Sequence, residues 1–374
     1  MSERIRVLVV DDSALMRKLI PAILERDPSI EVVGTAMDGA FALKKIEELH
    51  PDVVTLDLEM PRMDGMETLR LIMRRAPLPV IVFSTHSKEG AYATFKALAL
   101  GAIDFVAKPR NAAAGHLDAI AVQLIEKIKV AKRASGRTIR QSVPLETQPV
   151  AKKVVRATLP PNRIVAIGIS TGGPNALQYV LSQIPADFPA STLIVQHMPE
   201  GFTEMFAKRL DECCALDVHE ARSGDLLVAG RVLICPGNRH MMVRRMPRGD
   251  MAVLSDGPPV NGHRPSADVL FHSVAQEFGL TAVGVIMTGM GDDGAEGLGA
   301  IKAAGGMTVA QSEDTCVVSG MPRAAIVKGY ANKIVSLDAL SSFLVSHCGG
   351  ERSEREKSDK QEKNQRTPVS SQRP

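Results

Sequence analysis

Three segments in the second half of the chain carry the side-chain types that acyl transfer needs. The first reads Gly168-Ile169-Ser170-Thr171-Gly172, a G-x-S-x-G pattern on a predicted strand-to-helix turn, which is a setting that exposes a serine nucleophile. The second places His197 between an apolar run and a predicted helix, and the third carries the adjacent Asp292 and Asp293. A serine needs a base to take its proton, and the base needs a carboxylate to orient it. The three segments therefore predict a serine hydrolase that uses Ser170, His197 and one of the two aspartates.

Each of these segments also has a plainer interpretation. A glycine-rich turn is equally typical of phosphate-binding or purely structural loops. A single histidine at a strand end is more often a core or capping residue, and His240 occupies a second such position, although we favour His197.

The third segment also fits the dinucleotide-binding pattern G-x-G-x-x-G, through Gly289, Gly291 and Gly294, with Asp314 downstream as a ribose-binding acid. A nicotinamide dehydrogenase is thus the rival hypothesis. Two carboxylates inside that turn would repel a pyrophosphate, and a dinucleotide site leaves Ser170 and His197 without a role, so the hydrolase is favoured.

A second group of chemical side chains lies in the first part of the chain, where each member ends a predicted strand. Asp11 and Asp12 follow the first strand, Asp57 the third, Ser84 the fourth and Lys108 the fifth. In a parallel sheet these ends meet at one edge, where ligands bind. Three carboxylates together favour Mg²⁺, and one of them can accept a phosphoryl group. The alternative, that each aspartate only caps the next helix, does not explain why all five groups meet.

The elements that must position these side chains alternate between strands and helices in both halves. The first part has five apolar runs rich in Val and Ile, at 4–10, 30–36, 53–57, 80–84 and 103–107, separated by amphipathic stretches such as 90–100. The second part resumes the pattern, with expected strands at 163–169, 191–196, 231–235, 281–287 and 307–311, a small hairpin at 240–244 and 251–254, and helices at 173–184, 202–211, 266–278 and 294–304. Such alternation predicts parallel sheets covered on both faces.

Composition limits the class of protein. The chain has 374 residues, which suits two domains, and 45% of them are apolar, so each domain can bury a core. A net charge of +3 argues against a protein devoted to nucleic acid, and five cysteines without metal-type spacing suggest reduced structural thiols. No signal peptide or bilayer-spanning run is expected, which predicts a cytoplasmic protein.

Two segments lose the periodic pattern. Residues 133–160 are basic and contain Pro144, Pro149 and Pro160, which predicts a flexible linker, and residues 349–374 are charged and predicted to be disordered. A basic cluster, Arg239, Arg244, Arg245 and Arg248, would either meet an acidic protein surface or form a solvated turn.

Residues 1 to about 130 resemble response-regulator receiver domains through VLVVDDS, VVTLDLEMPRMDG, VFSTHS and GAIDFVAKP. The resemblance implies that Asp57 accepts phosphate from a histidine kinase, that Asp11, Asp12 and Asp57 hold Mg²⁺, and that Ser84 and Lys108 sense the phosphate. A DNA-binding response regulator is the competing class, but no basic helix-turn-helix follows the linker.

The rest of the chain resembles the chemotaxis protein-glutamate methylesterase family, whose members are also glutamine amidases, through GISTGGP, QHMPEGF, HRPSADVLF, MTGMGDDGAEGL and DTCVVSGMPRAA. The resemblance implies that Ser170 is the nucleophile, His197 the base and Asp293, rather than Asp292, the orienting acid. It implies oxyanion contacts from Thr171 and Met290 and no cofactor for the esterase reaction.

The expected architecture is α/β throughout: a (βα)5 receiver at 1–132, a linker at 133–160, a doubly wound, Rossmann-like hydrolase domain at 161–348, and a tail at 349–374. Because the chain order Ser-His-Asp differs from that of α/β-hydrolases, that particular fold is not expected. The resemblance further implies methyl-accepting chemotaxis receptors as substrate and a chemotaxis histidine kinase as phosphodonor, with no nucleic acid and no membrane insertion.

Overall fold

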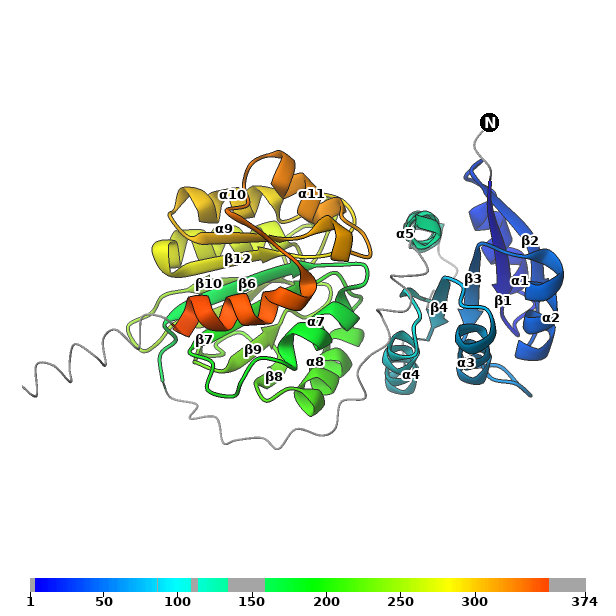
Figure 1. Cartoon of the computed structure of the whole chain (residues 1–374), viewed down its shortest axis with the longest axis horizontal. Coiled ribbons are helices and arrows are strands. Elements are labelled where there is room, and N and C mark those ends of the chain that lie inside the picture. Colours follow the sequence, from blue (N-terminus) through cyan, green and yellow to red (C-terminus); the bar gives the residue numbers. More distant parts are fainter. Residues whose placement is uncertain (1–3, 86, 109–113, 134–158, 350–374) are drawn as a thin grey trace, which may run out of the picture.

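The computed structural model describes residues 4–85, 87–108, 114–133 and 159–349, which form two α/β domains (Figure 1). The predicted linker and the predicted C-terminal tail fall almost wholly outside these residues. Within the described ranges, no helix has both the length and the apolar character that crossing a bilayer requires.

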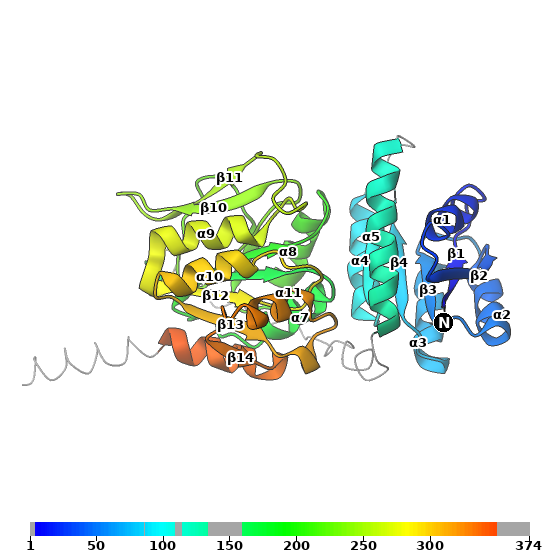
Figure 2. The ribbon, with the colours of Figure 1, turned by 90° about the horizontal axis from the view of Figure 1, so that it is seen from above.

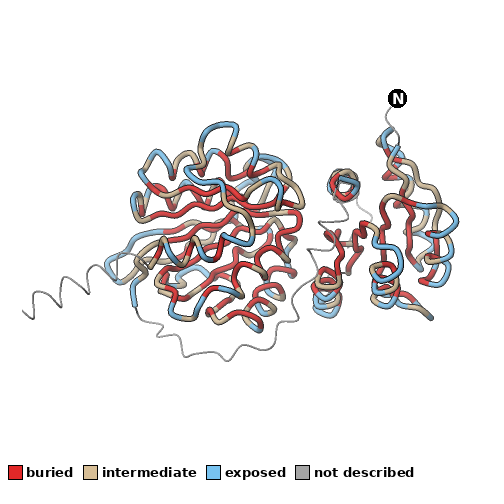
Figure 3. Tube along the Cα trace, viewed as in Figure 1, coloured by how far each residue is buried: buried red, intermediate tan, exposed pale blue. Residues whose placement is uncertain are grey.

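The N-terminal domain is a five-stranded parallel sheet in the order β2-β1-β3-β4-β5. Helices α1 and α5 pack on one face, and α2, α3 and α4 on the other, so that the strands are buried between them (Figure 3). This burial on both faces explains the continuous apolar runs of the strands. The elements are β1 (Ile5–Val10), α1 (Met16–Leu24), β2 (Ile30–Ala36), α2 (Gly39–Leu49), β3 (Val53–Asp57), α3 (Gly65–Arg75), β4 (Val80–Ser84), α4 (Lys88–Ala99), β5 (Asp104–Ala107) and α5 (Ala114–Arg133).

Three helices of this domain begin where the sequence supplies a capping side chain. Asp38, Asp64 and Ser87 precede α2, α3 and α4, and each accepts a hydrogen bond from the amide three residues ahead, at 3.0, 2.7 and 2.9 Å. Such caps satisfy an amide that has no partner within the helix.

The C-terminal domain is built on a seven-stranded parallel sheet in the order β14-β13-β12-β6-β7-β9-β8. From β6 the chain proceeds to β7 on one side and later returns to β12 on the other, which makes the carboxyl end of β6 a topological switch point. The strands are β6 (Arg163–Ile169), β7 (Ala190–Gln196), β8 (Asp217–Glu220), β9 (Arg231–Ile234), β12 (Ala282–Ile286), β13 (Met307–Gln311) and β14 (Lys333–Val335).

Helices cover both faces of this larger sheet. One face packs α7 (Gly173–Leu181), α8 (Phe202–Cys213) and a helix at 337–349, and the other packs α9 (Ala267–Phe278), α10 (Ala295–Ala303) and α11 (Gly320–Val327). An antiparallel hairpin, β10 (His240–Arg244) with β11 (Met251–Ser255), packs against α9. The five cysteines are buried free thiols.

The expected fold class, two parallel α/β domains, is confirmed, and so are the hairpin and each strand expected from the sequence. The sequence reading missed β8, β14, α11 and the helix at 337–349. Strand β8 is polar, with Val218 alone fully buried, and β14 is a three-residue edge strand whose Lys333 and Ile334 are exposed. Neither strand carries the apolar alternation that identifies a strand.

The receiver-like domain packs against the second domain through α4 and β5, and Figure 2 shows α4 and α5 on the side facing the second domain. Two aromatic pairs cross the boundary. Phe95 on α4 stacks on Phe206 of α8 with ring centroids 5.4 Å apart, and Phe105 on β5 stacks on Phe202 of α8 at 4.8 Å.

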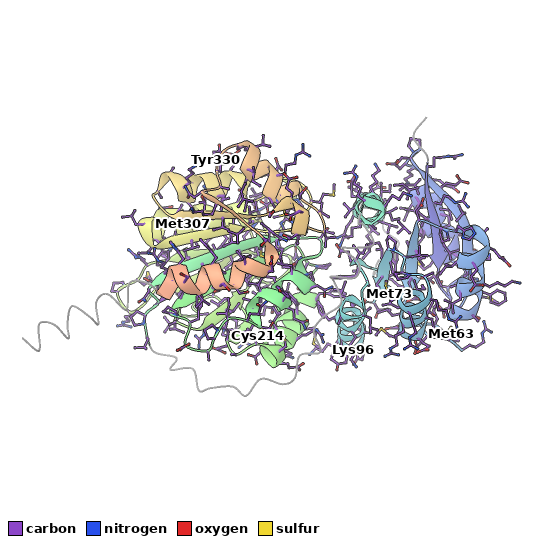
Figure 4. All side chains as sticks on the ribbon, in the orientation of Figure 1. Met63, Met73, Lys96, Cys214, Met307 and Tyr330 are labelled. Atoms are coloured by element: carbon purple, nitrogen blue, oxygen red, sulfur yellow. The ribbon has the colours of Figure 1, made fainter. Side chains whose placement is uncertain are left out.

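The opposite, exposed side of α4 is polar. Lys96, labelled in Figure 4, lies over the ring of Tyr92 at 4.4 Å from its centroid. At the end of the same helix, the Leu98 carbonyl accepts a hydrogen bond of 2.9 Å from Asn175 on α7. The boundary is therefore specific, with an aromatic centre and a polar contact beside it.

Candidate active site

The structure brings Ser170 and His197 to neighbouring positions of adjacent strands. The preceding residues, Ile169 of β6 and Gln196 of β7, are paired in the parallel sheet, and the His197 amide donates to the Ile169 carbonyl at 3.1 Å. Neighbouring strands lie about 4.8 Å apart. The two candidate catalytic residues thus leave the sheet together at its switch point.

The turn that carries Ser170 is fixed by its backbone. The Ser170 amide donates to the Thr288 carbonyl at 3.0 Å, and its carbonyl accepts from Gln196 Nε2 at 2.9 Å. Gly172 follows with φ of 77°, a left-handed conformation that favours glycine, and a side chain there would overlap Val317. Gly289, after β12, lies so close that an added Cβ would be 2.8 Å from Ser170 Cβ.

His197 is joined to the third predicted residue, Asp293. Its Nε2 lies 2.8 Å from Asp293 Oδ2, and its Nδ1 is buried without a hydrogen-bond partner in the described part of the chain. A ring that donates from Nε2 leaves Nδ1 unprotonated, so Nδ1 is the atom available to accept a proton.

Asp293, in the loop between β12 and α10, is fully buried against the start of α9. Its carboxylate accepts hydrogen bonds from Ser266 Oγ at 2.6 Å and from the amides of Ala267 and Asp268 at 2.6 and 3.2 Å. Burial raises the pKa of Asp293, but the hydrogen bonds from His197, Ser266 and Ala267 outweigh it and lower the pKa to about 2. The carboxylate is therefore ionised and aligned, with the positive end of a helix directed at it.

The alternatives for the base and the acid occupy different surroundings. Asp292 is exposed, in contrast to its neighbour. His240 is buried, with Nδ1 accepting from the Ser266 amide at 3.3 Å and Nε2 facing the Pro258 carbonyl at 3.0 Å, so both ring nitrogens have structural partners. The geometry selects His197 and Asp293 from the candidates.

The predicted oxyanion contacts, Thr171 and Met290, lie on the turns after β6 and β12. Among the described residues, neither of their amides donates to a protein acceptor. The contact between Gly289 and Ser170 brings the two turns together. Unpaired backbone amides near a nucleophile are the kind of donor that an oxyanion needs, so Thr171 and Met290 stay predicted oxyanion contacts.

Two residues that support the site were not anticipated from the sequence. Gln196 Nε2 bonds the carbonyls of both Ser170 and His197, and Ser266 holds Asp293 from a loop 27 residues away in the chain. The only sequence signal for Ser266 was its position as the first residue of a predicted helix, whereas its hydroxyl donates to Asp293.

The acidic cluster of the N-terminal domain also assembles. Ligand oxygens of Asp11, Asp12 and Asp57 lie within 4.8 Å of one another, and Lys108 Nζ is 2.6 Å from Asp57 and 3.2 Å from Asp11. Burial raises the pKa of Asp57, and the Lys108 ammonium only partly offsets that effect. Burial opposes the charge of Lys108, yet the bond to Asp57 outweighs burial and raises the pKa of Lys108.

This donor set suits a hard divalent cation. Three carboxylates crowded at one edge repel one another, and Mg²⁺ takes oxygen ligands of this kind. Asp12 is exposed while Asp11 and Asp57 are buried, so the cluster is accessible from one side.

Ser84 lies at the end of β4 as expected, but its hydroxyl is engaged with α4. It donates to the Gly90 carbonyl at 3.0 Å and accepts from Thr94 Oγ1 at 2.6 Å. In this structure Ser84 therefore contacts α4 rather than the carboxylates.

Comparison with known proteins identifies the family of each domain. Residues 7–118 match the family described as response regulator receiver domain, and residues 165–344 match CheB methylesterase. The chain is 62% identical to "Protein-glutamate methylesterase/protein-glutamine glutaminase 2" of Koribacter versatilis, with 93% of this chain and 97% of that protein covered. It is 47% identical to the protein-glutamate methylesterase/protein-glutamine glutaminase of Symbiobacterium thermophilum, with 92% and 97% covered.

Among solved structures, the Thermotoga maritima CheB methylesterase catalytic domain aligns with 37% identity and a TM-score of 0.48, covering 49% of this chain and 97% of that one. The identities to the full-length relatives exclude the dehydrogenase and the DNA-binding regulator considered from sequence. The chain belongs to the family of protein-glutamate methylesterases/protein-glutamine glutaminases, hydrolases that carry a response-regulator receiver domain.

Proposed function

We propose that this protein removes methyl esters from glutamate side chains of methyl-accepting chemotaxis receptors, and deamidates selected glutamines, under the control of phosphorylation at Asp57. The observation that carries the proposal is the contact between His197 and the buried Asp293, at 2.8 Å, beside a serine on the neighbouring strand. The family membership given above supports the substrate class.

The reaction follows from the positions of these groups. Ser170 Oγ attacks the ester carbonyl carbon while His197 Nδ1 takes the hydroxyl proton, and the imidazolium is stabilised by Asp293. The carbonyl oxygen becomes an oxyanion that the amides of Thr171 and Met290 stabilise. His197 then protonates the departing methoxide, which leaves as methanol.

Deacylation uses the same residues. Water attacks the acyl-serine, His197 accepts its proton and returns it to Ser170 Oγ, and the free glutamate is released. With a glutamine side chain the leaving group is ammonia instead of methanol. No cofactor takes part in these steps.

In the receiver domain, Asp57 accepts the phosphoryl group from a chemotaxis histidine kinase. Asp11, Asp12 and Asp57 would hold Mg²⁺, which would neutralise charge between carboxylate and phosphate. Lys108, which is 2.6 Å from Asp57, would contact the phosphate, and Ser84 would leave α4 to reach it. We infer a cytoplasmic protein, because its kinase and the modified receptor segments lie there.

The domain boundary supports control of access. Helices α7 and α8, which the receiver contacts, begin directly after the loops of Ser170 and His197. Val317 fills the space beside Gly172 and packs against the apolar cluster of the receiver domain. We infer that the unphosphorylated receiver holds the site closed and that phosphorylation loosens this contact.

The test is methanol release from methyl-labelled receptor, with and without a small phosphodonor. We expect phosphodonor to raise the rate in the wild type and not in Asp57→Asn. Ser170→Ala should lose nearly all turnover, whereas Ser182→Ala, at the end of α7, serves as the matched serine control. Wild-type methanol release by a folded Ser170→Ala variant would refute the assignment.

A further inference from the structure

A second histidine lies flat against the catalytic one. The rings of His263 and His197 have centroids 4.1 Å apart and an interplanar angle of 8°. His263 is half-buried in the loop between β11 and α9, and the mechanism above gives it no role. For the two rings to stay parallel at this distance, the surrounding residues must fix the positions of both His197 and His263.

The loop around His263 is built to hold it. Val260 and His263 exchange two backbone hydrogen bonds, of 3.0 and 2.9 Å, across a two-residue turn. The central residues, Asn261 and Gly262, have φ of 50° and 77°, which are the left-handed angles of a tight turn. Asn261 Nδ2 also donates to Asp268 at 3.0 Å, which fastens the turn to the first turn of α9.

The residue after His263 fixes the other side of the loop. Arg264 donates through Nε and Nη2 to Asn238 Oδ1, at 3.0 and 2.6 Å. Its Nη1 donates to the carbonyls of Asp256 and Gly257, at 3.2 and 3.0 Å. The backbone on both sides of His263 is therefore anchored to protein groups.

The need for such a support follows from how His197 is attached. Asp293 binds Nε2, on one edge of the ring, through a hydrogen bond of 2.8 Å that points away from the Cβ–Cγ axis. This bond orients the ring, but it restrains the ring at one atom only. Nδ1, on the other edge of the ring, is buried and has no hydrogen-bond partner in the described residues, so packing has to hold that edge.

We propose that His263 is a positioning residue for catalysis: its ring covers one face of His197 and limits the motion of that ring, so that Nδ1 stays available as the base for Ser170. The proposal rests on the function proposed above. A flat contact opposes tilting and rotation of the ring, and so adds to the restraint that the Asp293 bond provides at Nε2.

The charge state of His263 is compatible with this role. Burial lowers the pKa of His263, and His197 lowers it further, while the carboxylates of Asp293 and Asp292 oppose both effects. His263 is thus neutral when His197 takes up the serine proton. A second positive charge at this distance would oppose formation of the imidazolium.

The test compares His263→Phe, which keeps a flat ring, with His263→Ala, which removes it. Both are assayed for methanol release from methyl-labelled receptor in the full-length phosphorylated protein. We expect His263→Ala to lower kcat about tenfold or more with little change in KM, because substrate binding is not the affected step. We expect His263→Phe to restore most of kcat.

Two results would overturn the proposal: His263→Ala with kcat equal to the wild type, or His263→Phe as impaired as His263→Ala although both variants are folded by circular dichroism. If His263→Ala does not fold, His263→Phe still decides, since the proposal requires it to be active. A wild type without turnover would instead reject the proposed function, so the two failures are distinguishable.

Discussion

At the scale of single residues, two adjacent aspartates differ in their surroundings. Asp292 is exposed, whereas Asp293 is fully buried and receives hydrogen bonds from His197, Ser266 and two helix amides. An exposed carboxylate cannot fix the orientation of a ring, because water competes for each of its oxygens. The motif alone left this choice open, since both residues have the same type and lie in the same loop.

We therefore expect Asp293→Asn to lower kcat by about 10³–10⁴-fold, because an amide that donates to Nε2 would favour the wrong tautomer of His197. Asp292→Asn is the matched control and should keep kcat near the wild type. The measurement is methanol release under saturating substrate. Equal effects of the two substitutions would contradict the role given to Asp293.

At the scale of elements, the amino end of α9 completes the site. It supplies the Ser266 hydroxyl and the amides of Ala267 and Asp268 to one carboxylate. The strand-end positions of Ser170, His197 and Asp293 followed from the sequence, because parallel strands bring their carboxyl ends to one edge. The contribution of α9 did not follow from the sequence. Ser266 and Asp268 lie 27 and 25 residues from Asp293 in the chain, and no local sequence pattern indicates that they meet.

Ser266→Ala tests this element. Ser266 makes no capping hydrogen bond to α9, so its hydroxyl can be removed without losing a cap. Loss of one hydrogen bond to a charged group should lower the free energy of unfolding of the catalytic domain by about 2 kcal/mol at neutral pH. Denaturant unfolding followed by circular dichroism measures the difference.

The same variant gives a pH dependence with a defined sign. The pKa of Asp293 is lowered from 3.8 to about 2 in the folded protein, so its contribution to stability is complete above 3.8 and is lost as pH falls through about 2. The difference in unfolding free energy between wild type and Ser266→Ala should therefore be constant near neutral pH and shrink below 3.8. A difference that grows on acidification would contradict an ionised Asp293.

At the scale of the whole molecule, the receiver contacts the helices that leave the active site. Among the described residues, the boundary includes two aromatic pairs, one side-chain hydrogen bond and the packing of Val317, with Phe95 and Phe105 on the receiver side. The sequence predicted two domains and a linker but not which faces meet, because Phe95 and Phe105 sit in patterns that equally suit the interior of the receiver. Both residues do contact that interior as well as the second domain.

Phe95→Ala should shift the protein toward the undocked form and raise the basal rate without a phosphodonor. Each loss of about 1.4 kcal/mol at the boundary increases the undocked fraction tenfold, and an aromatic pair contributes about 0.5–1.5 kcal/mol beyond its buried area. Phe41→Ala is the matched control, because Phe41 lies on α2, away from the boundary, and is 47% exposed. Methanol release is measured for both variants, with thermal unfolding of the receiver as a check on its integrity. A lower basal rate of a folded Phe95→Ala variant would contradict this expectation. Docking would then assist catalysis, because the contact would support the loops of Ser170 and His197 through α7 and α8.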